Sequence, residues 1–461
     1  MSNTYPTNAS LIPKWLMCLM LLWSFLPKAF SQEMDLRAGV KLDGILTSAD
    51  NLPFWMLVNK DGQFGAETTF SVLALAEGDY WLNEDSRISA GFAGFYRNNT
   101  TNEFRRRDLF LEYKNRWVRS RIGSRKDSIR AQGLSITNKD FLFSGNTRPL
   151  SGLKVEAYAP LRISNTFSID WGIAHYVLND NRYVDNVWVH YKRLGLVTRF
   201  NERSKLIARL THYAQWGGTS PKFGDLPDDF TAFVDVFFAR RASEDSGIDR
   251  ENANAVGNHL GSYYLDYFLD LDQGRLNLYH EHPFEDGSGT RLANFPDGVW
   301  GAHWQWLDNE WIDGVLFEYV QTTDQSGRPG GSGGDNYFSN GIYPSGWTYD
   351  TRVVGIPVIL NDPTIDLDNN PTAIISNRVK AVHFAATGHR KQLSWMLKLT
   401  YQRQFGRYQI PFDPAIDVVS TYLGLSYNTI FGTFGLTTAV DLIDPGENQL
   451  AAGLSYSYRF D

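Results

Sequence analysis

Apolar and polar residues alternate one by one along many stretches of this chain. At the C-terminal end Leu450, Leu454, Tyr458 and Phe460 fall on one face, with small or polar residues on the other. A period of two is typical of a β-strand, and a strand that crosses a bilayer at a tilt needs about ten residues. Strands of soluble sandwiches average only about five or six residues. The pattern therefore predicts strands that cross a membrane.

The same alternation recurs upstream, where acidic residues take the polar face. In "YLDYFLDLD", Leu265 and Leu269 oppose Asp266 and Asp270. Carboxylates facing a dry core would be costly, whereas carboxylates facing a water-filled interior are not. Apolar residues outside and polar residues inside predict an all-β protein, a transmembrane antiparallel β-barrel with long extracellular loops.

The spacing of turns predicts how the barrel is threaded. Short turns alternate with long connections at 283–298, 323–377 and 404–418, and in such barrels the short turns are periplasmic and the long loops external. Residues 323–377 are expected to form one large external excursion. The remaining chain, at the same strand density, brings the total to about 18 strands. The C-terminal strands are expected near 265–271, 275–282, 299–307, 311–322, 378–387, 392–403, 419–427, 432–442 and 449–460.

The N-terminus is typical of a secretory signal peptide. Lys14 precedes the apolar run 15–26, and small residues precede a cleavage point after Ser31. The expected organisation is a signal peptide over 1–31 and a single barrel domain over 32–461. Cys18 is the only cysteine, so the mature chain is expected to have no disulfide, thiol nucleophile or thiolate metal site.

Composition narrows the possible partners. The net charge of −7 gives no basic footprint for nucleic acid, and no run of eighteen apolar residues follows the signal peptide. A secreted chain with this pattern has no bilayer to enter other than the outer membrane of a Gram-negative bacterium. Outer-membrane lipid is therefore an expected partner.

The first candidate site is "YHEHPFEDGSG", residues 279–289. Pro283 ends the predicted strand, so His280 and His282 are expected at the extracellular rim, with Glu285 and Asp286 in the following loop. Three interpretations stay open: rim side chains at headgroup level, a polysaccharide-contact surface, or a metal or catalytic centre. Two imidazoles are too few for a zinc site, which needs three or four ligands, so no metal ligand and no catalytic residue is assigned.

The second candidate is a basic segment over residues 105–130. Its arginines alternate with apolar or small residues on one strand and are predicted to point into the lumen. They either form ladders with carboxylates, with Asp266, Asp270 or Glu318 as partners, or line the interior electropositively for an acidic glycan or anionic solute. The expected lumen lining is Arg119, Arg121, Arg125, Lys126 and Arg130.

The third candidate is the glycine-rich stretch 325–347. Aromatic faces and carboxylate or amide groups, which are common in sugar-binding sites, follow its glycines. A mobile loop without a ligand is the alternative, and whether Ca²⁺ binds the loops stays open. The polysaccharide-binding candidates here are Asp335, Asn336, Tyr337, Tyr343 and Trp347.

Four stretches resemble the capsule-assembly Wzi family of outer-membrane proteins. They are "GSRKDSIRAQGLSITNKDFLFSGNTRPL" (123–150), "GNHLGSYYLDY" (257–267), "HPFEDGSG" with "PDGVWG" (282–301) and "DNYFSNGIYPSGWTY" (335–349). The resemblance spans some two thirds of the mature chain and is to the barrel-only branch of the family. It implies an 18-stranded barrel that acts as a surface lectin for capsular polysaccharide.

The resulting hypothesis is a non-enzymatic, lectin-like barrel that retains capsular or other surface polysaccharide during capsule assembly. No cofactor is expected, and other capsule-export components are further candidate partners. The alternatives are a porin-like channel for small acidic solutes and an outer-membrane hydrolase. External segments folded over the mouth favour the lectin, whereas an open lumen favours the channel.

Overall fold

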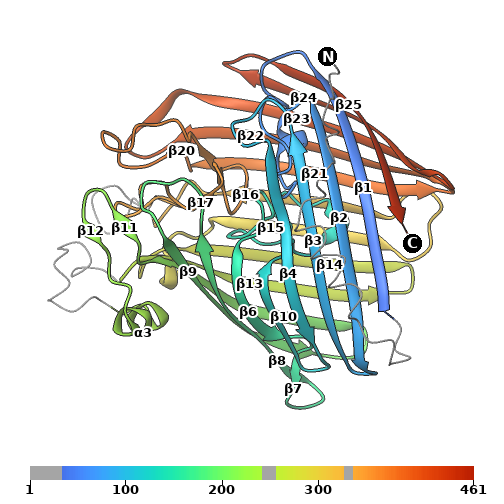
Figure 1. Ribbon diagram of the computed structural model, residues 1–461, viewed down its shortest axis with the longest axis horizontal. Coiled ribbons are helices and arrows are strands. Elements are labelled where there is room, and N and C mark those ends of the chain that lie inside the picture. The colour runs from blue at the N-terminus through green and yellow to red at the C-terminus, as the bar shows by residue number, and fades with distance from the viewer. Residues whose placement is uncertain (1–33, 241–255, 327–335, 461) are drawn as a thin grey trace, which may run out of the picture.

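The computed structural model is a closed antiparallel β-barrel of 18 wall strands (Figure 1). It describes residues 34–240, 256–326 and 336–460, so the predicted signal peptide lies outside the described residues. Strand β1 (Met34–Thr47) pairs with β2 (Phe70–Asn83) on one side and with the last strand, β25 (Gln449–Phe460), on the other. This pairing closes the sheet and leaves no free edge. No helix among the described residues is long and apolar enough to span a membrane.

The other wall strands follow one another around the barrel in chain order. The first half contains β3 (Ser86–Arg97), β4 (Phe104–Lys114), β5 (Val118–Ser124), β6 (Ser151–Ala157), β8 (Phe167–Leu178), β9 (Val187–Arg199) and β10 (Ser204–Trp216), with the short β7 (Leu161–Arg162) continuing the line of β6 beside β8. The second half contains β13 (Asn258–Leu271), β14 (Gly274–Phe284), β15 (Gly298–Trp306), β16 (Gly314–Gln321), β21 (Val379–Arg390), β22 (Leu393–Gly406), β23 (Pro411–Thr429) and β24 (Gly432–Asp444). The fold class, the strand total and all nine C-terminal strands are confirmed.

One predicted connection, 404–418, is wrong. β22 continues to Gly406 and β23 begins at Pro411, so only residues 407–410 join them. Proline has no N–H to donate and is tolerated at a strand edge that lacks a partner. β24 pairs with β23 only from Asp417 onward, so Pro414 lies where that side of β23 has no neighbour. Prolines in a sequence are typical of a loop, which explains the wrong prediction, but here they do not interrupt the strand.

The two faces of the wall follow the predicted alternation. Leu397, Leu399 and Tyr401 of β22 are exposed on the outside, while Asp266 of β13 is buried on the inside. The expectation of a water-filled interior is corrected. Asp266 accepts hydrogen bonds from the Lys139 ammonium, with both oxygens 3.0 Å away, so this carboxylate is partnered and removed from solvent.

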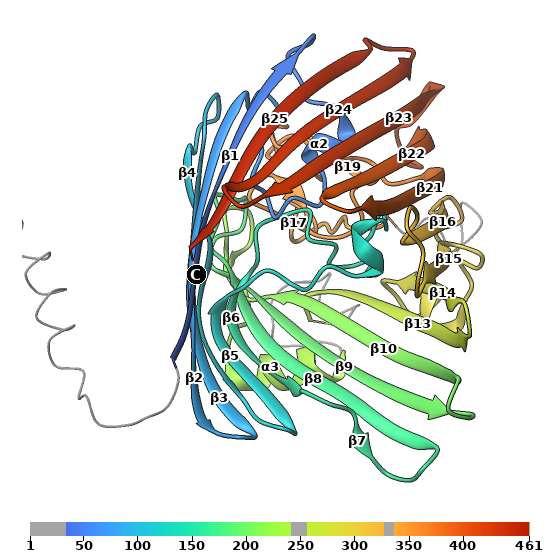
Figure 2. The ribbon, with the colours of Figure 1, turned by 90° about the vertical axis from the view of Figure 1, so that its right-hand side faces the viewer.

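Three connections fold inward and fill the barrel (Figure 2). Residues 48–69 contain α2 (Phe54–Leu57), residues 125–150 contain the 3₁₀ turn η1 (Ala131–Gly133), and the described part of the third connection, residues 322–326 and 336–378, contains two small hairpins. We call these three connections the plug. The hairpins pair β17 (Thr348–Tyr349) with β18 (Arg352–Val353), and β19 (Leu360–Asn361) with β20 (Ile374–Ser376).

The plug and the inner wall share the largest apolar core of the molecule. Phe141 and Trp347 of the plug are fully buried, and the Trp347 ring lies 5.4 Å from that of Tyr213 on β10. The described residues between β16 and β21 add no wall strand, because these two strands pair directly with each other. Much of this segment nevertheless packs inside the barrel instead of forming the external excursion expected from the sequence.

The loop end of the barrel carries the remaining elements. Helix α3 (Phe230–Phe238) begins after Asp229, whose side chain caps the Ala232 N–H at 2.8 Å. The helix packs against the outer face of β10 through Ala214 and Trp216 (Figure 1). The other elements here are β11 (Thr219–Ser220), β12 (Gly224–Asp225) and η3 (Gly289–Arg291).

Cysteine labelling tests which end of the barrel faces outward. Short turns mark the end that holds both chain termini, so the loop end is expected to be extracellular. In a Cys18→Ser background, Asn369→Cys at the loop end should react with an impermeant maleimide on intact cells. Asp308→Cys, in the turn between β15 and β16, should react only after the outer membrane is permeabilised. Both positions are exposed; the reverse labelling pattern would show that the barrel is inserted the other way round.

Candidate functional site

The two rim histidines occupy different environments. His280 of β14 stacks on Trp300 of the neighbouring strand at 3.6 Å between ring centroids. His282 is buried, with its Nδ1 3.1 Å from the Asp297 carbonyl oxygen. Between them, Glu281 points inward and accepts a hydrogen bond from the Phe141 N–H of the plug at 2.7 Å. The described residues contain no group of three His, Cys, Asp or Glu side chains placed to hold a metal ion.

Glu285 and Asp286 lie beside a cavity of about 560 Å³ at the loop end, and Asn336 joins them there. Glu285 Oε1 accepts a hydrogen bond from the Phe338 N–H at 2.7 Å, which ties its loop to the plug. Asp286 Oδ1 accepts hydrogen bonds from the Ser288 and Gly289 N–H groups within its own loop. Three of the predicted binding residues therefore border one cavity.

We call this space the mouth cavity. The Asn340 amide donates to Asn258 Oδ1 at 3.2 Å, which links the plug to the start of β13. The Ser339 N–H donates to the Asn336 carbonyl, and Ser339 adds a hydroxyl group to the lining of the cavity. Sequence reasoning did not select Asn258 or Ser339, although the stretches "GNHLGSYY" and "NYFSN" contain them. The lining of the mouth cavity includes Asn258, Phe284, Glu285, Asp286, Thr290, Asn336, Ser339 and Asn340.

The predicted aromatic candidates are buried in the plug. Tyr337, Tyr343 and Trp347 are at most 1% exposed. The Trp347 indole donates to the Leu142 carbonyl at 2.7 Å, and the Tyr343 hydroxyl donates to the Gly217 carbonyl at 3.2 Å. In this structure their rings face protein, so they hold the plug together instead of presenting a stacking surface. Asp335 lies outside the described residues.

The buried carboxylate of Asp297 joins the loop between β14 and β15 to the plug beside the mouth cavity. Asp297, between β14 and β15, accepts hydrogen bonds from the Asp324 and Gln325 N–H groups and, at 3.1 Å, from the Tyr337 hydroxyl. Burial raises the pKa of Asp297, while these hydrogen bonds act to lower it. Asp297 therefore fixes the start of residues 322–378 beside the mouth cavity.

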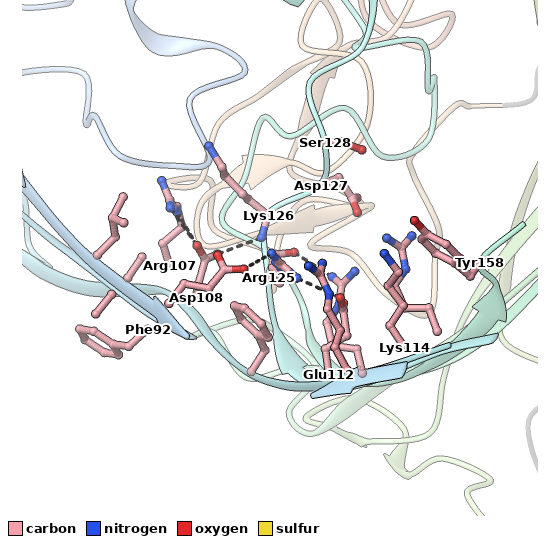
Figure 3. A pocket seen from close by; sticks show the side chains of 18 residues that line it. Phe92, Arg107, Asp108, Glu112, Lys114, Arg125, Lys126, Asp127, Ser128 and Tyr158 are labelled. Carbon is pink, nitrogen blue, oxygen red and sulfur yellow. Dashed lines mark hydrogen bonds and ion pairs between the residues drawn. The ribbon is translucent and has the colours of Figure 1, made fainter. Parts of the chain in front are cut away.

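The arginines of this basic segment point inward and form ladders with carboxylates (Figure 3). Arg121 Nε lies 2.9 Å from Glu112, and Arg125 bridges Glu112 at 3.0 Å and Glu77 at 2.5 Å. Arg119 pairs with Glu156. The partners differ from the expected Asp266, Asp270 and Glu318, because the choice depends on which strands and plug segments meet inside the barrel.

The other two basic candidates follow Arg125 in the plug. Lys126 donates its backbone N–H to Asp108 at 2.9 Å, and its side chain is exposed. Arg130 lies deeper and donates to the Lys139 carbonyl at 3.0 Å. The five predicted lumen residues are therefore divided between the wall and the roof formed by residues 125–130.

These features define a class: an outer-membrane β-barrel with a filled interior, a polar cavity at its loop end and a basic inner wall. No family model and no curated protein matches the sequence. The fold is similar to that of Wzi from Escherichia coli, described as an outer-membrane protein involved in group 1 capsule assembly and a carbohydrate-binding β-barrel. The identity is 13%, the TM-score is 0.61, and the match covers 97% of this chain and 88% of Wzi.

Two further solved structures show weaker likenesses. OprD from Pseudomonas aeruginosa matches with 9% identity and a TM-score of 0.47, over 93% of this chain and 95% of OprD. OccAB4 from Acinetobacter baumannii matches with 10% identity and a TM-score of 0.48, over 93% of this chain and 99% of OccAB4.

Proposed function

We propose that this protein is a non-enzymatic, lectin-like barrel of the Wzi type that binds surface polysaccharide at its extracellular end. The observation that carries the proposal is the mouth cavity, where amide, carboxylate and hydroxyl groups converge beside Phe284. Such groups match sugar hydroxyls, and an aromatic ring suits their C–H faces. The carbohydrate-binding description of Wzi, whose fold this chain shares, supports the same proposal.

Weak binding at one cavity suffices for retention of a polymer. A polysaccharide presents many identical repeats, and many barrels lie in one membrane, so multivalent attachment retains the polymer without one tight pocket. A deep, fully enclosed pocket is therefore not required. Capsule assembly is the process in which such retention would be used.

The filled interior disfavours the channel alternative. A porin-like path needs a continuous water-filled lumen, whereas Trp55, Phe141 and Trp347 pack across the barrel with at most 2% exposure. We therefore expect the wild-type protein to conduct ions poorly in a planar bilayer. A large, stable conductance would support the channel in place of the lectin.

Blocking the mouth cavity tests the lectin proposal. Ser339→Tyr places a ring inside the cavity, so binding of the purified protein to polysaccharide extracted from its own host should weaken about tenfold or more. Asn369→Tyr adds the same ring at an exposed position of the same loop and should leave binding unchanged. Glycan size, followed by gel filtration, should stay constant. Shortening of the glycan by the wild type, or equal binding by both variants, would contradict the proposal.

A further inference from the structure

A second cavity, of about 480 Å³, lies on the inner wall below the plug (Figure 3). Arg87 and Lys114 line it next to the short turns, and residues 125–128 of the plug cover its opposite end. It therefore extends toward the end of the barrel that holds the two termini, whereas the mouth cavity lies at the loop end. We call it the basic cavity.

The basic cavity has an excess of positive charge. Seven Lys or Arg and four Asp or Glu side chains line it, in a chain whose net charge is −7. The overall composition therefore does not account for the positive charge of the basic cavity. A cleft with low-dielectric walls concentrates the field of its charges and raises the local concentration of counter-ions.

Arg121 on the wall and Arg125 at the start of the plug are held in place and keep donors for a ligand. A guanidinium has five N–H donors. Arg125 donates through Nη1 to Glu112 and through Nη2 to Glu77, and its guanidinium lies 4.3 Å from the centroid of the Phe110 ring. Its remaining N–H groups and those of Arg121 are positioned without further ordering of the side chains. Such preorganised forks suit carboxylate and phosphate oxygens.

The Lys126 ammonium takes no part in the ladders of arginines and carboxylates. Among the described residues, its ammonium has no hydrogen bond or ion pair, and only its backbone N–H is bonded, to Asp108. Asp61 lies within electrostatic range, and burial raises the pKa of Asp61 to about 7. Lys126 therefore borders the roof of the cavity, and its ammonium has no hydrogen-bonded or ion-paired carboxylate among the described residues.

We propose that the basic cavity binds the anionic group of a small acidic solute, a carboxylate or phosphate of about monosaccharide size, which enters from the periplasmic side. The volume falls within the usual range for ligand pockets, roughly 300–1,000 Å³. Arg121 and Arg125 orient the anion through forked hydrogen bonds, and Lys126 adds a positive charge at the roof. This site is independent of the mouth cavity and of the proposed lectin function.

Binding to matched sugars tests this site. The purified barrel in detergent should bind glucuronate or glucose 6-phosphate, and the comparison of these two probes identifies the preferred anion. Neutral glucose should not bind, and added salt should weaken binding because it screens the charges. Equal binding of glucose and both acidic probes, or no binding of either acidic probe, would overturn the proposal.

Variants of Lys126, at the roof of the basic cavity, test whether the anion binds beside this residue. Lys126→Met should weaken anion binding several-fold, and Lys126→Glu should weaken it about tenfold or more. Lys391→Met, in the exposed turn between β21 and β22, should have no effect. Heat-dependent migration on a gel reports whether each variant is folded. The mouth-blocking variant Ser339→Tyr should leave anion binding unchanged, so the two proposals can fail separately. Anion binding that is insensitive to Lys126→Glu in a folded barrel would overturn the assignment.

Discussion

Trp347→Ala is expected to loosen the plug and to open a path for ions through the barrel. The Trp347 side chain is fully buried, packs against Tyr213 and donates its indole N–H to the Leu142 carbonyl. Its removal leaves a large cavity and an unpaired carbonyl, and large-to-small changes of this kind cost about 3–5 kcal/mol. The variant should show raised planar-bilayer conductance and faster proteolysis of residues 322–378.

The barrel wall should remain folded in the Trp347→Ala variant. Its strands are closed by β1 and β25 far along the chain from the plug, so the variant should keep the heat-dependent gel migration of a folded barrel. Trp117→Ala is the matched control, because that side chain is 52% exposed in a short turn. Low conductance and unchanged proteolysis in Trp347→Ala would show that this residue does not hold the plug in place.

Leu454→Arg is expected to be the most damaging single change on the lipid face of the last strand. Leu454 lies in the middle of β25, is 69% exposed and pairs with Leu436 and Gly44 on the two neighbouring strands. Arginine on the lipid face at the bilayer midplane costs about 2–4 kcal/mol. Urea unfolding in lipid vesicles should therefore show a stability loss of this size.

The adjacent position provides the control. Ser455 points inward, where Asp43 of β1 lies directly across and Gly435 leaves space beside it. Ser455→Arg can place its charge near that carboxylate, so it should lose much less stability than Leu454→Arg. Equal losses for the two variants would contradict the facing of β25, because a shift of one residue exchanges the two faces of a strand.

Local pattern predicted the wall well. The alternation in "LAAGLSYSYRF" indicated which side chains meet lipid, because strand geometry sends successive residues to opposite faces. The same rule placed Arg119, Arg121 and Arg125 inside. The start of β23 at Pro411 was missed because prolines such as Pro414 are typical of a loop, and only the missing β24 neighbour explains why Pro414 is tolerated in the strand.

Local pattern could not show what fills the interior. Tyr337, Tyr343 and Trp347 follow a glycine-rich stretch, and such aromatics look alike whether they stack on a sugar or pack in a core. The alternation likewise says that Asp266 faces inward but not that Lys139 meets it there.

By itself, then, the sequence determined an outer-membrane barrel, its strand faces and its basic inner wall, since these depend on neighbours one or two residues apart. The tertiary structure alone decided that three connections fold inward, that the arginines pair with Glu77, Glu112 and Glu156, and that Glu285, Asp286 and Asn336 share one cavity. Each of these outcomes brings together residues that are distant in the chain, and the closure of the barrel places them side by side.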